Sequence, residues 1–115
     1  YPKDDTPGCT KEACGFRDAY EEFKESGAEV IGVSSDSIDS HKKFASKYQL
    51  PFTLLSDEGG RVRRLFGVSS TLGLFPGRVT YLIDKEGIVR HIFSSQFQVE
   101  RHIQEAKKML AKVGS

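Results

Sequence analysis

The two cysteines of the chain lie close together, in the stretch Thr6-Pro7-Gly8-Cys9-Thr10-Lys11-Glu12-Ala13-Cys14. A thiol becomes a nucleophile by losing its proton, and a free cysteine with a pKa of about 8.5 is mostly protonated at neutral pH. Thr6 is a suitable N-cap and Pro7 suits the first helical position, so Cys9 is predicted in the first turn of a helix. There its sulfur can face free N–H groups and the positive end of the helix dipole. The pattern therefore predicts a reactive thiolate at Cys9.

Two further side chains are candidates to act beside this sulfur. Thr6 carries a hydroxyl three residues upstream, which can hydrogen-bond the thiolate or an incoming oxygen. Arg78 follows a Phe75-Pro76-Gly77 turn, at the predicted start of a strand. A planar guanidinium can donate to both a sulfur and a peroxide oxygen, which a lysine does poorly. We expect Arg78 to fold in beside Cys9, and a surface position is the alternative.

Inert packing and metal binding are the other interpretations of the cysteines. Cys14 on its own would be read as a buried, unreactive thiol. A metal site would need Cys9 and Cys14 together with the histidines, which are His41, His91 and His102. The cysteines lack the two-residue spacing of zinc knuckles, and each histidine lies in a different predicted element. The sequence therefore predicts no resident metal, and histidines that face solvent or take part in packing.

Composition restricts the class of protein. The 115 residues are 37% hydrophobic and 29% charged, with a net charge of +1, as in an ordinary globular domain, here expected to span 1–115. The basic residues are scattered among acidic ones, so a nucleic-acid partner is not expected. No apolar run is long enough for a membrane span. Two cysteines are too few for a secreted disulfide scaffold.

Helical and extended periods alternate along the chain. The predicted elements are a helix from Pro7 to about Ser26 that stops at Gly27, a doubly buried strand 29–34, a helix capped by Ser37 that ends before Pro51, a strand 52–55, a short helix 61–66, a loop 69–77, a hairpin of 79–83 and 88–93, and a last helix with Val99, Ile103, Ala106, Leu110 and Val113 on one face. Strands joined through helices are parallel, and the hairpin should add an antiparallel pair to the same sheet. This order predicts a three-layer α/β sandwich of the thioredoxin-like type, with a central mixed sheet flanked by helices.

Three separated motifs resemble those of one family. Pro2-Lys3-Asp4-Asp5-Thr6-Pro7-Gly8-Cys9 is similar to the Pro-x-x-x-Thr/Ser-x-x-Cys signature of peroxiredoxins. Thr-Pro-Gly-Cys-Thr, with a second cysteine five positions on, resembles the peroxiredoxin Q/bacterioferritin comigratory protein subfamily. Pro51-Phe52-Thr53-Leu54-Leu55-Ser56-Asp57 and Arg78-Val79-Thr80-Tyr81 continue the likeness, which is nearest to plant and cyanobacterial members.

The resemblance implies a peroxidase without metal, haem or other cofactor. Cys9 would attack hydrogen peroxide or a small alkyl hydroperoxide and become a sulfenic acid. Thr6 and Arg78 would hold the peroxide, and Pro2 would shield the sulfenate. Cys14 would close a disulfide with Cys9, which thioredoxin or a similar dithiol would reduce.

The resemblance also bears on the setting of the protein. A monomer is expected, in a chloroplast or in a cyanobacterial or bacterial cytoplasm. Family members have strands before the Tyr-Pro pair, so the sequence is expected to lack an N-terminal portion.

Helix geometry adds a requirement for the disulfide. Residues five apart in an α-helix lie roughly 8.7 Å apart between Cα atoms, on faces roughly 140° apart. A disulfide needs Cα atoms within about 6.8 Å. Cys9 and Cys14 therefore cannot pair while the first helix is regular, and we expect its first turns to unwind in each cycle. Two other functions remain open: a thioredoxin-like disulfide oxidoreductase, and a redox-sensing module without turnover.

Overall fold

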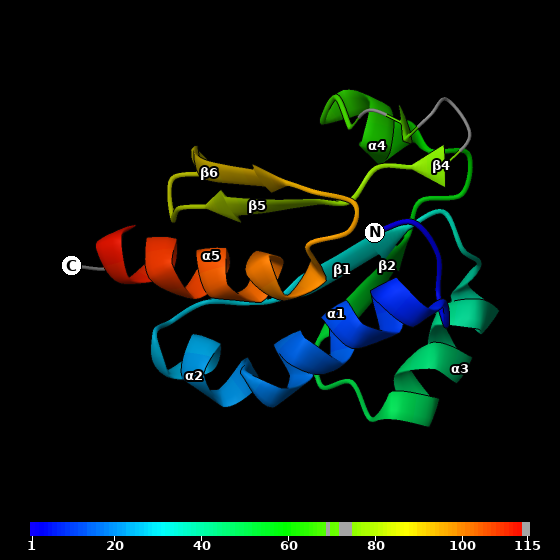
Figure 1. Cartoon of the computed structure of the whole chain (residues 1–115), viewed down its shortest axis with the longest axis horizontal. Helices are drawn as coiled ribbons and strands as arrows, with labels where there is room; N and C mark the ends of the chain where they lie inside the picture. The colour runs from blue at the N-terminus through cyan, green and yellow to red at the C-terminus, as the bar shows by residue number, and fades with distance from the viewer. Residues whose placement is uncertain (69, 72–74, 114–115) are drawn as a thin grey trace.

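The computed structural model describes residues 1–68, 70–71 and 75–113 (Figure 1). Helices and short strands follow one another in the order α1 (Pro7–Asp18), α2 (Tyr20–Glu25), β1 (Ile31–Ser34), α3 (Ile38–Tyr48), β2 (Thr53–Ser56), α4 (Arg61–Leu65), β3 (Ser70–Thr71), β4 (Phe75–Pro76), β5 (Val79–Ile83), β6 (Val89–Ser94) and α5 (Val99–Val113). The predicted types of all the long elements are confirmed. The predicted loop 69–77 contains the short β3–β4 pair, and its residues 69 and 72–74 lie outside the described part of the chain.

The first helix is interrupted, which corrects the prediction of one helix to Ser26. Ala19, with φ −94° and ψ 0°, separates α1 from α2. Ala19 and Phe23 are both buried against Ile103 of α5, so the interruption accompanies the packing of this helical segment onto the last helix. Gly27, at φ +80°, follows α2 as the predicted stop.

Local capping of α3 agrees with the sequence. The Ser37 hydroxyl accepts a hydrogen bond from Ser40 N at 3.1 Å. At the other end Gln49 adopts the left-handed conformation, with φ +53°.

The strands form three two-stranded sheets rather than the one expected mixed sheet. β1 pairs with β2 in parallel, and β3–β4 and β5–β6 are antiparallel. The predicted hairpin is therefore confirmed, but its addition to the β1–β2 sheet is wrong for the described residues. Neighbouring strands must lie about 4.8 Å apart to share a ladder, and in the described residues neither strand of the hairpin shares one with β1 or β2. The N-terminal segment contacts β1, because the amino group of Tyr1 donates to Val33 O at 2.8 Å.

Packing of helices on these sheets produces the layered arrangement. α1 packs against α5, α5 covers β5 and β6, and α3 lies against β2 (Figure 1). The main apolar cluster joins α2 and α5 through Ala19, Phe23, Ile103 and Ala106. The predicted inward face of α5 is confirmed at Val99, Ile103 and Ala106, and Leu110 packs against the same cluster. The side chain of Val113 lies outside the described residues.

Two further observations concern exposure. β1 is not buried on both faces as predicted, because Ile31 is 57% exposed. In the part of the chain that the structure describes, no helix combines the length and the apolar character needed to cross a bilayer.

The turn of the hairpin leads to a prediction about acid stability. The carboxylate of Asp84 accepts hydrogen bonds from the backbone N–H groups of Ile88 and Glu86, both at 2.9 Å, and contacts Arg90. These interactions, with Ile88 first, lower the pKa of Asp84. A lowered folded-state pKa stabilises the fold above the unfolded value of about 3.9, and this contribution is lost as the pH falls through the folded value.

We therefore expect Asp84→Asn to be less stable than the wild type near neutral pH. The difference should shrink as the pH falls below about 4, where the wild-type carboxylate also becomes neutral. Urea unfolding midpoints, measured at intervals from about pH 6 to about pH 3, would show this convergence. A difference that stays constant over that range would contradict it.

Candidate active site

Cys9 lies in the first turn of α1 and is only 2% exposed. Pro7 begins the helix, and Thr10 N donates to Thr6 O at 2.8 Å. Thr6 occupies the N-cap position with extended dihedrals, as predicted, but its side chain makes no capping hydrogen bond. The N–H groups of Gly8 and Cys9 are therefore not capped by Thr6. Together with the helix dipole, they favour negative charge on a sulfur or oxygen at this end of α1.

The hydroxyl of Thr6 is turned back along the chain instead. Its Oγ1 donates to the backbone oxygen of Lys3 at 2.8 Å. Because its hydrogen is engaged there, the lone pairs of Oγ1 are the part of this group that can meet a ligand. Thr6 is thus arranged to accept a hydrogen bond, such as one from the O–H of a hydroperoxide.

Arg78 joins this site from a distant part of the sequence, directly before β5. It is 5% exposed, which excludes the surface alternative. Its Nε donates to Gln96 O at 3.0 Å. Its Nη2 lies 2.9 Å from the place where a Cβ on Gly8 would stand, so a side chain at position 8 would collide with the guanidinium. The structure therefore brings Arg78 to the start of the helix that carries Cys9, as the sequence predicted.

Glu12 is a member of the site that the sequence analysis missed. Its Oε1 accepts a hydrogen bond from Arg78 Nη1 at 2.6 Å, and both side chains are buried. This ion pair holds the guanidinium in one orientation and balances its charge. The spacing from Cys9 to Glu12 is three residues, which places both on one side of a helix. That spacing was the only available signal, because the partner of Glu12 lies far along the chain.

A second residue that the sequence analysis did not place at the site, His102, contacts Glu12. His102, on α5, is fully buried, and its Nδ1 lies 3.6 Å from Glu12 Oε2. The ring is hydrogen-bonded through both nitrogens, to Thr80 Oγ1 at 2.8 Å and Ser95 O at 2.7 Å. The prediction that the histidines take part in packing is thus confirmed for His102, with hydrogen bonding in addition.

Cys14 lies in the same helix as Cys9 and is half-buried, and both thiols are free. Two cysteines five apart inside one regular helix cannot form a disulfide in this conformation. Pro2 is half-buried in the segment before Thr6. The roles of Cys14 and Pro2 remain predictions.

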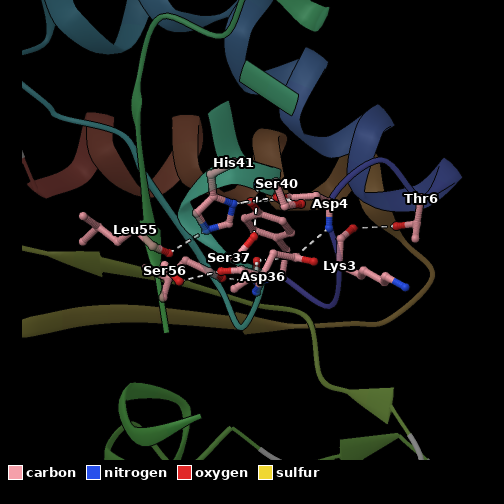
Figure 2. A network of polar contacts seen from close by, with 12 residues as sticks. Lys3, Asp4, Thr6, Asp36, Ser37, Ser40, His41, Leu55 and Ser56 are labelled. Carbon is pink, nitrogen blue, oxygen red and sulfur yellow. Dashed lines mark hydrogen bonds and ion pairs between the residues drawn. The ribbon is translucent and has the colours of Figure 1, made fainter. Parts of the chain in front are cut away.

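The segment before Cys9 also carries a polar network, shown in Figure 2. Asp4, Asp36 and His41 place ligand-type atoms within 4.8 Å of one another, a spacing that a metal ion could use. Hydrogen bonds within the protein, however, engage these same atoms: Asp4 Oδ2 with His41 Nδ1, and Asp36 Oδ2 with Asp4 N. The arrangement is that of a hydrogen-bond network. His41 is buried in it rather than facing solvent.

Comparisons with known proteins point to one family. The AhpC/TSA family profile matches residues 1–92. Chloroplastic peroxiredoxin Q proteins of Sedum lineare and Triticum aestivum are 61% and 60% identical over 96% of the chain, which spans 60% and 51% of their lengths. The chain thus covers between half and two thirds of these relatives.

Solved structures give the same result. Peroxidoxin BcpB of Mycobacterium tuberculosis is 40% identical, with a TM-score of 0.91 over all of this chain and 77% of its own. The bacterioferritin comigratory protein of Xanthomonas campestris, described for alkyl peroxide reduction, is 32% identical, with a TM-score of 0.91 over all of this chain and 76% of its own. These neighbours confirm the predicted thioredoxin-like α/β fold class.

Proposed function

Because the chain belongs to the AhpC/TSA family, with peroxiredoxin Q proteins as its relatives, we propose that it is a thiol-dependent peroxidase acting on hydrogen peroxide and small alkyl hydroperoxides. One observation carries the proposal. The buried Arg78, directly before β5, reaches Gly8 at the start of α1, next to Cys9, where no side chain caps the helix. A structural thiol has no need of that arrangement. Cationic and N–H donors around a sulfur favour the thiolate and stabilise an oxygen that gains charge.

The chemistry follows from these positions. The Cys9 thiolate attacks one peroxide oxygen, so that an S–O bond forms as the O–O bond breaks. The leaving oxygen departs as water or an alcohol after taking up a proton, and the sulfur becomes a sulfenic acid. Arg78 and the free N–H groups of α1 stabilise charge on the leaving oxygen. The Thr6 Oγ1 accepts a hydrogen bond from the O–H of the peroxide.

The second half-reaction requires Cys14. Its sulfur attacks the Cys9 sulfur, so that an S–S bond forms as the S–O bond breaks, and the hydroxide leaves as water with the proton that the Cys14 thiol gives up. A dithiol of the thioredoxin class then exchanges with the disulfide, restores both thiols and is itself oxidised. Pro2 shields the sulfenate. We propose that the working form is a monomer. We place it in a chloroplast, the compartment in the names of the relatives, or in a cyanobacterial or bacterial cytoplasm.

One treatment tests this function. Reduced protein is given one equivalent of hydrogen peroxide, and the product is analysed by peptide mapping and amide exchange. We expect both thiols to be lost to a Cys9–Cys14 disulfide, and the first turns of α1 to lose amide protection, because a regular helix keeps residues five apart out of disulfide range. Two free thiols after treatment would contradict the peroxidase, and unchanged protection in the oxidised protein would contradict the unwinding.

The same samples separate the two alternatives. A disulfide oxidoreductase would exchange with a disulfide substrate but leave peroxide unconsumed. A redox sensor would be oxidised once and would not turn over when thioredoxin is supplied. Sustained peroxide consumption with thioredoxin excludes both.

A further inference from the structure

The buried carboxyl group of Asp4 ties the segment that precedes Cys9 to α3. Asp4 accepts hydrogen bonds at Oδ1 from the Tyr1 hydroxyl, and at Oδ2 from Ser40 Oγ at 2.8 Å (Figure 2). Its third partner is Nδ1 of His41, at 2.7 Å. The Asp4 and His41 side chains are 3% and 5% exposed. We call this pair the Asp4–His41 clamp.

Both ring nitrogens of His41 are engaged by the protein. Nε2 of His41 lies 3.0 Å from Leu55 O, and Nδ1 faces the carboxyl group of Asp4. A carbonyl oxygen only accepts hydrogen bonds, so Nε2 is the donor to Leu55 O. Burial, followed by the hydrogen bond to Asp4, raises the pKa of the Tyr1 phenol, which therefore remains a donor. His41 thus bridges Asp4 and Leu55 O of β2.

The backbone of the same residue is anchored as well. Asp4 N donates to Asp36 Oδ2 at 2.8 Å, and Ser34 Oγ donates to the same oxygen at 2.6 Å. Ser56 Oγ donates to the backbone oxygen of Asp36. Asp4 is therefore fixed to the ends of β1 and β2 in addition to α3.

The next residue sets the direction of the chain. Asp5 has φ +57°, a conformation that non-glycine residues seldom adopt. Its carboxylate is held at the surface by Lys47 at 3.0 Å and Tyr48 Oη at 2.9 Å. Directly after this reversal, Thr6 Oγ1 meets Lys3 O. The Thr6 hydroxyl keeps its hydrogen on Lys3 O, and can then only accept a hydrogen bond from a ligand, as long as residues 3–5 hold this conformation.

We propose that the Asp4–His41 clamp positions Thr6 for the peroxide reaction, so that His41 and Asp4 are positioning residues although neither touches the substrate. The inference rests on the proposed function. It assigns a task to residues that the catalytic steps do not use: His41 fixes Asp4, Asp4 fixes the Lys3 carbonyl, and that carbonyl orients the hydroxyl. The burial of the clamp matters because a buried polar group that loses its hydrogen-bond partner costs far more than an exposed one.

The test is single-turnover oxidation of reduced Cys9 by hydrogen peroxide. His41→Gln keeps a hydrogen-bond donor but not the ring that bridges Asp4 and Leu55. We expect its rate constant to fall about tenfold with the full amplitude retained, which corresponds to one misplaced hydrogen bond. The control is Lys107→Gln, which removes an exposed ion pair with Glu22 outside this network and should stay within about twofold.

Two further measurements separate positioning from damage to the fold. Alkylation of Cys9 by iodoacetamide needs the thiolate but not the Thr6 hydroxyl, so its rate in His41→Gln should stay within about twofold of the wild type. Adding His41→Gln to Thr6→Val should cause little further loss in the peroxide rate, because the two residues act as one unit. Ser40→Ala, which removes one neutral hydrogen bond from the clamp, should give a smaller loss, of about two- to threefold.

Several results would overturn the inference. These are a wild-type peroxide rate in His41→Gln, a parallel fall of the peroxide and iodoacetamide rates, or effects of Thr6→Val and His41→Gln that multiply. If His41→Gln does not fold, a Ser40→Ala variant that reacts with peroxide at the wild-type rate would also overturn the inference. A wild-type protein that leaves peroxide intact would overturn the proposed function as well, whereas wild-type reactivity that survives these substitutions overturns this inference alone.

Discussion

Cys9→Ser is expected to abolish peroxide consumption, with a fall of at least about 10³-fold, because a serine hydroxyl at this position is not ionised near neutral pH. The substitution replaces sulfur by oxygen at a buried position and leaves the ion pair of Arg78 with Glu12 untouched. Its fold should therefore be close to that of the wild type. Peroxide consumption with excess dithiothreitol, followed by a peroxide-sensitive dye, measures the loss.

Cys14→Ser is the matched control, since it makes the same atomic change in the same helix. Dithiothreitol can reduce the Cys9 sulfenic acid directly, so this variant should remain active with dithiothreitol. It should lose the support of thioredoxin, which acts on a disulfide. Equal losses in the two variants with dithiothreitol would contradict the assignment of Cys9 as the attacking residue, and full support of Cys14→Ser by thioredoxin would contradict the resolving role of Cys14.

Arg78→Lys is expected to give the second largest effect. Lysine keeps the charge but loses the planar fork that donates to Gln96 and Glu12 while Nη2 reaches Gly8. We expect the second-order rate constant of Cys9 oxidation to fall about 10²-fold, which is typical for the loss of one preorganised donor to a developing negative charge. Stopped-flow mixing of the reduced protein with hydrogen peroxide measures this rate constant.

The controls for Arg78 address the buried carboxylate that it leaves behind. Arg78→Met alone removes the hydrogen-bonded cation from the buried Glu12 carboxylate, at a cost of about 3–5 kcal/mol. Arg78→Met combined with Glu12→Gln removes both charges, and should fold better than the single variant while remaining slow with peroxide. Arg90→Lys, at an exposed arginine of β6, should react at the wild-type rate. A fast Arg78→Lys variant, or a slow Arg90→Lys variant, would show that the guanidinium of Arg78 has no special role.

The sequence determined those features that depend on neighbours along the chain. The cap at Ser37, the stop at Gly27, the hairpin around Asp84 and the inward face of α5 all follow from local propensity and periodicity, and the structure shows each of them. The position of Cys9 at a helix start belongs to the same class. So does the expectation about the disulfide, because it uses only helix geometry. Local rules failed at Ala19 and Ile31, where packing decides whether a helix is interrupted and whether a strand face is covered.

Only the tertiary structure decided how the site is held. Glu12 and Arg78 are 66 positions apart, and Asp4 and His41 are 37 apart. A carboxylate in a sequence indicates a charge but not its partner, so the sequence does not show what Asp4 and Asp5 contact. In the fold Asp4 meets the buried His41 and Asp5 meets the exposed Lys47. The chain itself specifies a thiol at a helix start, whereas the pairing of the charged groups around it arises only when α3 meets the segment before Cys9 and Arg78 meets Glu12 of α1, since a buried charge needs a partner.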